Sequence, residues 1–293
     1  MNVFQKAVKT KRKLRLLITG PSGSVKTMGA LILAKQFAKR YDSRIAFIDT
    51  EHGKSTLYSS MFDYDILEMS EPFTPEKYIE NMVAAVNGGY KVIVVDSLSH
   101  EWIGTGGLLE THANMGGKFQ DWKPLTPRHR KFLDALISVD AHLICTGRSK
   151  TEYAMDSSGN GKITITKMGT KVEQREGLEF EFDTVFKGNM QHIVEVDTDH
   201  TGLFDGFAEK LTEKTADKLI AWLDEGIDVK RPTQEEELAN DVKDLVSRMQ
   251  VAGVFTEEQI EKASHIKTRS MLILAERKFE LMVENETKDE VTE

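Results

Sequence analysis

The chain has 293 residues, of which 40% are hydrophobic and 29% are charged, and its net charge is −8. These values are typical of a globular protein and exclude fibrous, disulfide-rich and mainly disordered chains. The single cysteine, Cys145, cannot form an intramolecular disulfide, and no apolar run approaches the ~18 residues of a membrane span. The sequence therefore predicts a cytoplasmic protein that does not interact with a membrane.

Apolar runs alternate with segments of helical periodicity in the first half of the chain. The expected strands are residues 14–19, 44–49, 91–96 and 142–146, and the expected helices are 27–38, 74–86 and 127–139. Continuous apolar strands that alternate with helices are typical of a parallel sheet covered on both faces. Beyond residue 147 we expect short strands at 163–166, 184–186 and 193–196, which extend the sheet in the antiparallel direction. A helix is expected to follow at 208–223.

The C-terminal part of the chain carries most of the negative charge. Residues 232–293 contain 15 acids and 8 bases, a net charge of −7. A linker at 231–233 precedes three expected helices at 235–249, 256–263 and 268–283, and the last ten residues are expected to fray. The expected domains are therefore residues 1–230, which begin with a basic arm at 1–13, and an acidic helical region at 231–293.

The most informative stretch is the loop that follows the first expected strand. Backbone N–H groups of a phosphate-binding loop surround a polyphosphate, its lysine adds a positive charge, and its last hydroxyl ligates Mg²⁺. Lys26 and Thr27 are placed for the last two tasks. The loop matches the pattern GxxxxGK[ST] except that valine replaces the last glycine, and its residues are Gly20, Pro21, Ser22, Gly23, Ser24, Val25, Lys26 and Thr27.

Valine in this loop is the first departure from the pattern. A β-branched side chain resists positive φ, and its bulk would crowd a backbone that must touch phosphate oxygens. We therefore expect Val25 to slow hydrolysis more than it weakens nucleotide binding.

Acidic residues follow two of the other expected strands. Asp96 ends the strand at 91–96, where its carboxylate can hold the Mg²⁺ shell through water beside Thr27. Glu51 follows the strand at 44–49 and could orient and deprotonate the attacking water. Glu101, five residues beyond Asp96, is the alternative base, and Glu51 would then be a solvated loop residue.

Several motifs in order resemble known ATPases. Residues 45–52 and 92–97 resemble the second-strand and metal-carboxylate motifs of RecA-type recombinases. Residues 96–102, 146–153 and 174–182 resemble a narrower group, the bacteriophage-type RecA-like "AAA family" ATPases, some of which are associated with single-strand-annealing recombination. The resemblance covers roughly residues 14–207.

This resemblance implies roles for individual residues and ligands. It implies that Glu51 activates water, that Arg148 at the end of the fourth strand senses the γ-phosphate, and that the ligands are ATP and Mg²⁺. It also implies a homo-oligomer. At residues 198–201 the sequence Thr-Asp-His-Thr stands where a Lys-Asp-Arg-Thr-like element is expected, and the loss of basic residues there would slow hydrolysis.

The predicted fold is a RecA-like P-loop NTPase, an α/β fold with a mainly parallel central sheet, short antiparallel strands and a C-terminal helical appendage. The predicted function is Mg-dependent ATP hydrolysis coupled to DNA recombination, repair or replication in a phage-type system. The partner would be single-stranded DNA or a DNA-bound recombination or replication protein. The alternative is a nucleotide-gated oligomer or partner-binding module with little ATP turnover.

Two segments combine lysines with aromatic residues, which suits single-stranded nucleic acid. The first, 104–123, contains Lys118, Phe119, Trp122 and Lys123, and the second, 150–171, contains Tyr153, Lys162, Lys167 and Lys171. The alternative interpretation is that Trp102 and Trp122 are core anchors and that the lysines are a solvated surface.

Overall fold

The computed structural model describes residues 6–158, 162–227 and 234–267, together with 271–272, 275–276, 278–280 and 282–283. Within these ranges, 151–158, 162–170 and 234–237 are described by their backbone alone. The chain divides into two compact units, Met1–Ile227 and Asp228–Glu293. The expected linker and the last ten residues lie outside the described residues. Among the helices described, none is long and apolar enough to cross a membrane.

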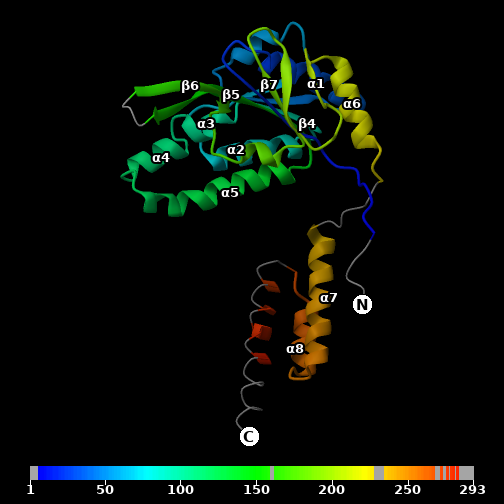
Figure 1. The fold of residues 1–293 in the computed structure, drawn as a ribbon. Helices are drawn as coiled ribbons and strands as arrows, with labels where there is room; N and C mark the ends of the chain where they lie inside the picture. The colour runs from blue at the N-terminus through cyan, green and yellow to red at the C-terminus, as the bar shows by residue number, and fades with distance from the viewer. Residues whose placement is uncertain are drawn as a thin grey trace. The chain divides into compact units, whose positions relative to one another are not determined.

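The first unit is built on one sheet with the strand order β3-β2-β4-β5-β1-β7-β8-β9, drawn in Figure 1. Neighbouring strands from β3 to β7 are parallel, whereas β8 and β9 are antiparallel to their neighbours. The predicted parallel sheet with an antiparallel extension is therefore confirmed. The strands are β1 (Arg15–Gly20), β2 (Ile45–Asp49), β3 (Asp65–Glu68), β4 (Val92–Asp96), β5 (His142–Ser158), β7 (Thr184–Gly188), β8 (Val194–Asp199) and β9 (Ala208–Glu209).

Four strands differ from expectation. β9 lies at the start of the helix expected at 208–223, and this helix, α6, begins instead at Glu213. β7 pairs in parallel with β1, so the antiparallel extension begins one strand later, at β8. β3 was not predicted, because Asp65 and Glu68 leave only two apolar residues between them. β5 continues far beyond residue 146 and forms a long hairpin with β6 (Lys162–Val172), which projects beyond the sheet in Figure 1.

Helices cover both faces of the sheet, because side chains of a strand alternate between its two faces. Leu16 and Ile18 share a core with α1 (Lys26–Arg40) and α6 (Glu213–Asp224). Leu17 belongs to a second core with α2 (Pro75–Asn87) and α5 (Trp122–Ser138). α2 begins after Thr74, whose hydroxyl accepts a hydrogen bond from the backbone N–H of Lys77, as expected for a helix cap.

Short helices that the sequence did not predict connect the longer elements. Segments of three to seven residues carry too little periodicity to be recognised. α5 begins at Trp122, five residues before its predicted start, and one of these short segments, η2, directly precedes it. These segments are η1 (Lys54–Tyr58), α3 (Ser99–Ile103), α4 (Leu108–Asn114), η2 (Phe119–Asp121) and η3 (Leu178–Glu181).

In the described part of the basic N-terminal arm, residues 6–13, basic side chains form ion pairs with acidic residues of the same unit. Lys9 Nζ lies 2.6 Å from a carboxylate oxygen of Glu225, and Arg12 Nη2 lies 2.6 Å from Asp183 Oδ1. Part of the arm's charge is thereby neutralised within the protein.

The second unit has a small core of its own. α7 (Gln234–Ala252) and α8 (Glu257–Ser264) occupy the predicted ranges, and the expected third helix lies only partly within the described residues. Apolar residues from the three segments form the core: Val242, Leu245, Met249, Ala263 and Leu272.

Candidate nucleotide-binding site

The phosphate loop joins the carboxyl end of β1 to the first residue of α1. A Cβ at Gly20 would lie 2.6 Å from Ser24 Oγ and 2.8 Å from the carbonyl oxygen of Gly188, so this position requires glycine. Gly23 has a φ of +78°, in the left-handed region that favours glycine. The two glycines that the motif retains are therefore the two that the backbone needs.

Val25 does not have the conformation that we expected. Its φ of −71° and ψ of −1° are right-handed helical, and its side chain is 8% exposed within the core beside α1. Room for this side chain comes from Gly188, since a Cβ at Gly188 would lie 3.0 Å from Val25 Cγ1. The expectation that valine is forced into positive φ and crowds the loop is wrong.

Lys26 is buried and folded back onto its own loop. Its Nζ donates hydrogen bonds to the carbonyl oxygens of Gly20, at 3.0 Å, and Pro21, at 2.7 Å. Burial lowers the pKa of Lys26, and the nearby carboxylates of Asp96 and Glu51 oppose this effect. Among the residues described, the hydrogen-bond partners of this cation are neutral carbonyl oxygens, which an anionic phosphate would replace favourably.

Asp96 lies next to Thr27, as the sequence predicted. Thr27 Oγ1 donates to Asp96 Oδ2 at 2.5 Å, and the hydroxyl of Thr146 donates to the other carboxylate oxygen. Burial raises the pKa of Asp96, although the hydrogen bonds from Thr146 and Thr27 oppose the rise. Sequence reasoning missed Thr146, because a β-branched residue in a strand carries no distinct signal.

Glu51 and Arg148 form an ion pair with two hydrogen bonds. Arg148 Nε lies 2.7 Å from Glu51 Oε1, and Nη2 donates to Oε2. Burial alone would raise the pKa of Glu51, but the hydrogen bonds and charge of Arg148 outweigh it, so this pKa lies below its ordinary value. Lys54 Nζ adds a weaker contact, 3.7 Å from Glu51 Oε2. The predicted base and the predicted γ-phosphate sensor are thus brought together.

Backbone contacts hold each partner of this pair at the carboxyl edge of the sheet. The backbone N–H of Glu51 donates to Asp49 Oδ1 at 2.6 Å, which shapes the turn after β2. The backbone N–H of Arg148 donates to Ser99 Oγ at 2.9 Å, and Arg148 lies opposite Gly20 in the β1–β5 register. Asp49 and Ser99 are positioning residues, a role that the sequence did not indicate for either of them.

Glu101 lies in a different environment from Glu51. Its side chain is fully buried, with His129 Nδ1 at 3.1 Å from Oε1 and Gln174 Nε2 at 3.0 Å from Oε2. This polar cluster joins α3, α5 and the segment after β6. Of the two candidate bases, Glu51 is the one whose carboxylate reaches solvent, at 13% exposure.

The segment 104–123 presents one aromatic side chain to solvent. The ring of Trp122 stacks on His112, with centroids 4.0 Å apart, and on Trp102, with centroids 5.4 Å apart. Trp102 and Trp122 therefore act as packing anchors, whereas Phe119 is 93% exposed. In the second segment the side chains of Tyr153, Lys162 and Lys167 lie outside the described part of the structure.

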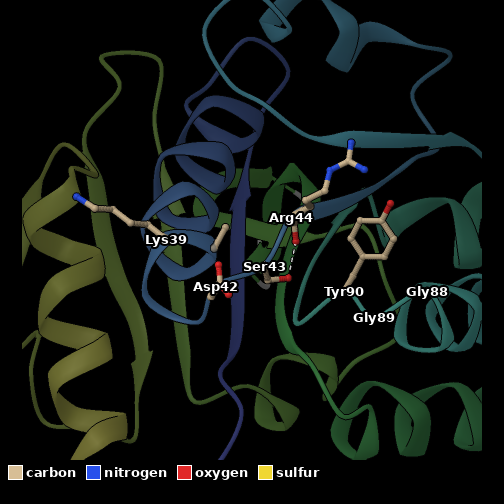
Figure 2. A pocket seen from close by; sticks show the side chains of 8 residues that line it. Lys39, Asp42, Ser43, Arg44, Gly88, Gly89 and Tyr90 are labelled. Carbon is tan, nitrogen blue, oxygen red and sulfur yellow. Dashed lines mark hydrogen bonds between the residues drawn. The ribbon is translucent and has the colours of Figure 1, made fainter.

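An open pocket of about 620 Å³ lies at the other edge of the sheet, and Figure 2 shows its lining. It lies between the turns that precede β2 and β4, and Lys39, Arg44 and Tyr90 contribute side chains. Because these turns precede the strands, the pocket is at their amino ends, and the phosphate loop is at the carboxyl ends. The pocket is not part of the candidate nucleotide site.

Of the comparisons with known proteins, the match to a family model agrees with this geometry. Residues 12–206 match the model of a family described as AAA domain. The search of curated proteins finds no match. Among solved structures, a KaiC-like protein, PH0186, from the hyperthermophilic archaeon Pyrococcus horikoshii OT3 is 15% identical, with a TM-score of 0.40; the match covers 63% of this chain and 78% of that chain.

Proposed function

Because this chain belongs to the AAA domain family and contains a P-loop ATPase domain, we propose that it binds Mg·ATP at the loop 20–27 and hydrolyses it with Glu51 as the base. One observation carries the proposal. Thr27, Asp96, Glu51 and Arg148 come from four different segments and form two hydrogen-bonded pairs, Thr27–Asp96 and Arg148–Glu51, at the carboxyl edge of the sheet. A polyphosphate bound in the loop would lie beside all of them.

The residues present fit a phosphate and a magnesium ion. Ser24 Oγ is buried and has no hydrogen-bond partner within the residues described, so it is free to donate to a phosphate oxygen. Thr27 and Asp96 supply the hydroxyl and carboxylate oxygens that Mg²⁺ prefers. Bound Mg²⁺ would neutralise phosphate charge, and its own charge would favour the ionised form of Asp96.

The proposed reaction is attack of water on the γ-phosphorus. The carboxylate of Glu51 accepts a proton from the water, the new P–O bond forms, and the bond to the oxygen that bridges the β- and γ-phosphates breaks. ADP leaves with inorganic phosphate. Lys26 and Arg148 neutralise the charge on the phosphate oxygens as the bond breaks.

We propose that hydrolysis is coupled to DNA recombination, repair or replication, with single-stranded DNA or a DNA-bound protein as partner and a homo-oligomer as the working state. The motif resemblance at 96–102, 146–153 and 174–182 supports this proposal. The exposed ring of Phe119 between Lys118 and Lys123 also supports it, because a ring flanked by cations suits a nucleobase and its phosphates.

A second candidate function is a nucleotide-gated module with little turnover. The observation that favours it is the ion pair itself, since Arg148 occupies both carboxylate oxygens of the proposed base. A phosphate-release assay separates the two functions. Turnover that rises with single-stranded DNA supports the coupled ATPase, and tight nucleotide binding with negligible turnover supports the module.

The nucleotide site is tested by Lys26→Ala. This change removes the cation inside the loop and should weaken ATP binding at least about tenfold, which equals about 1.4 kcal/mol. The matched control is Lys35→Ala in the same helix, whose exposed side chain lies 3.6 Å from Glu213 and should leave ATP affinity unchanged. Calorimetric titration measures both variants. Unchanged affinity in Lys26→Ala would exclude the phosphate-loop assignment.

The base is tested by comparing Glu51→Gln with Glu101→Gln. Glu51→Gln keeps the shape of the side chain but removes the base, so turnover should fall by ~10²-fold or more while ATP is still bound. Glu101→Gln alters a buried cluster and should lower the free energy of unfolding, with turnover per folded molecule retained. The opposite result, inactivation by Glu101→Gln alone, would assign the base to Glu101.

A further inference from the structure

We propose that the Glu51–Arg148 pair makes this site discriminate ATP from ADP. The terminal phosphate of ATP takes Arg148 from Glu51, and the carboxylate then becomes free to accept a proton from water. ADP has no such phosphate and leaves the pair intact. The inference rests on the proposed function, because it places ATP in the loop 20–27.

The pair withholds Glu51 from catalysis in the absence of nucleotide. Both carboxylate oxygens accept hydrogen bonds from one guanidinium, in the two-point geometry that Arg and carboxylate favour. Burial raises the pKa of Glu51, but the hydrogen bonds and charge of Arg148 outweigh this effect and hold the pKa below its ordinary value. A carboxylate with a lowered pKa is a weaker base, so release from Arg148 increases its ability to take a proton.

Arg148 is the partner that can move. The turn that carries Glu51 is held by Asp49, and the backbone of Arg148 is held by Ser99, so neither main chain has to shift. The guanidinium is at the end of a long flexible side chain that is 37% exposed, whereas the Glu51 side chain is 13% exposed. Rotation of the Arg148 side chain is therefore sufficient to exchange partners.

The terminal phosphate competes well for Arg148. It carries more negative charge than a carboxylate and accepts the same two-point hydrogen bonding. Arg148 lies opposite Gly20 in the sheet, and its charge acts on the pKa of Lys26, so its side chain is close to the loop. When Arg148 leaves, Lys54 remains within 3.7 Å of Glu51 as a weaker, exposed counter-charge.

Affinities of a double-mutant cycle test this exchange. The cycle consists of the wild type, Glu51→Gln, Arg148→Gln and the double variant, each titrated with Mg²⁺ and either ADP or the β,γ-imido analogue of ATP. Glu51→Gln should tighten the analogue about fivefold, because Arg148 no longer has to leave a full negative charge, and should change ADP affinity less than about twofold. Arg148→Gln should weaken the analogue alone.

The double variant carries the decisive comparison. Adding Glu51→Gln to Arg148→Gln should leave affinity for the analogue unchanged, because no arginine remains to be released. The matched control is Glu68→Gln, which removes an exposed carboxylate near Gly53 and should alter neither affinity. The proposed exchange of Arg148 would be overturned if Glu51→Gln left the ratio of analogue affinity to ADP affinity unchanged. It would also be overturned if Glu51→Gln tightened analogue binding equally in the Arg148→Gln background. If the wild type bound neither nucleotide, or if Lys26→Ala bound both with unchanged affinity, the proposed function itself would be overturned.

Discussion

At the scale of single residues, Val25 illustrates how a departure from a motif can be compensated by a small neighbour. The valine has helical φ and ψ angles, and its side chain packs where Gly188 leaves space. A glycine at this position is therefore not needed for the backbone conformation of the loop. The steric reason to expect impaired hydrolysis disappears with this observation.

Val25→Gly should destabilise the protein without improving catalysis. The change removes a buried side chain and adds backbone freedom at the start of α1, so the free energy of unfolding should fall by about 2–3 kcal/mol. ATP affinity and turnover should change less than about twofold. Urea unfolding and phosphate release measure the two effects, with Val25→Ala as the control that keeps helix propensity. A large rise in turnover at unchanged stability would restore the crowding hypothesis.

At the scale of elements, the chain between β4 and α5 is organised by stacked rings. Trp122 contacts Trp102 and His112, which ties the start of α5 to α3 and α4. The remaining aromatic side chain of this segment, Phe119, is in η2 and extends into solvent. The packing and the proposed contact with DNA thus involve different rings of one segment.

Phe119→Ala should affect DNA binding, whereas Trp122→Ala should affect stability. Phe119→Ala should leave the free energy of unfolding within about 0.5 kcal/mol but weaken single-stranded DNA binding by about 1–3 kcal/mol, the value of one stacked base. Trp122→Ala should lower the free energy of unfolding by about 1–3 kcal/mol, because it removes a partly buried ring that stacks on Trp102 and His112. Thermal unfolding and oligonucleotide anisotropy at low and high salt measure these effects. Equal DNA affinity in Phe119→Ala and the wild type would remove Phe119 from the interface.

The start of β5 contains a pH-sensitive element. His142 is buried, and its Nδ1 accepts a hydrogen bond from the backbone N–H of Leu14 at 3.1 Å. Burial, with the positive charges of Lys13 and Arg15, lowers the pKa of His142 from 6.5 to about 3. The unfolded chain therefore binds a proton below pH 6.5 that the folded protein does not bind, so this contribution to stability is lost as the pH falls toward 3.

By pH 5, His142 alone should lower the free energy of unfolding by about 2 kcal/mol relative to neutral pH. His142→Asn keeps an acceptor for Leu14 but does not titrate, so its loss between pH 7 and pH 5 should be smaller by that amount. The control is His192→Asn, at an exposed position with a φ of +60° that asparagine accepts. Denaturant unfolding at several pH values gives the difference. Parallel pH profiles for His142→Asn and the wild type would contradict the assignment.

At the scale of the whole molecule, each of the two units has an apolar core of its own. The first unit contains the sheet with its two covering layers of helices and the entire candidate site. The second unit contains a separate small core and lies in the acidic part of the sequence. The candidate nucleotide site and most of the acidic charge therefore lie in different parts of the chain.

Deletion of residues 232–293 should leave nucleotide binding intact. ATP affinity should stay within about twofold of the full-length value, because no residue of the candidate site is removed. Single-stranded DNA should bind equally well or more tightly, since the deletion removes a net charge of −7 that repels phosphate. Titrations of the truncated and full-length proteins at matched salt make the comparison. Loss of DNA binding with an intact nucleotide site would assign recognition to the acidic helices.

Local sequence patterns by themselves determined the core of this fold. Apolar runs and helical periodicity located β1, β2, β4 and α2 to within a residue or two. A strand buried on both faces gives a continuous apolar run, and a helix buried along one stripe gives apolar residues at helical spacing, so neighbouring residues are sufficient to predict both. The candidate phosphate loop could be identified in the same way, because its residues are contiguous and its flanking strand and helix are long. Short or weakly apolar elements such as β3 and α4 could not be predicted, because a few residues carry little periodicity.

Only the tertiary structure decided which of the candidate side chains meet. Glu51 and Arg148 are 97 positions apart, and their pairing depends on strand order and on the turns that follow β2 and β5. Burial of Glu101 with His129 and Gln174, and the space that Gly188 leaves for Val25, likewise arise between segments distant in the chain. Residue type and spacing identify candidates, whereas contacts between distant segments set their charge partners, exposure and chemical role.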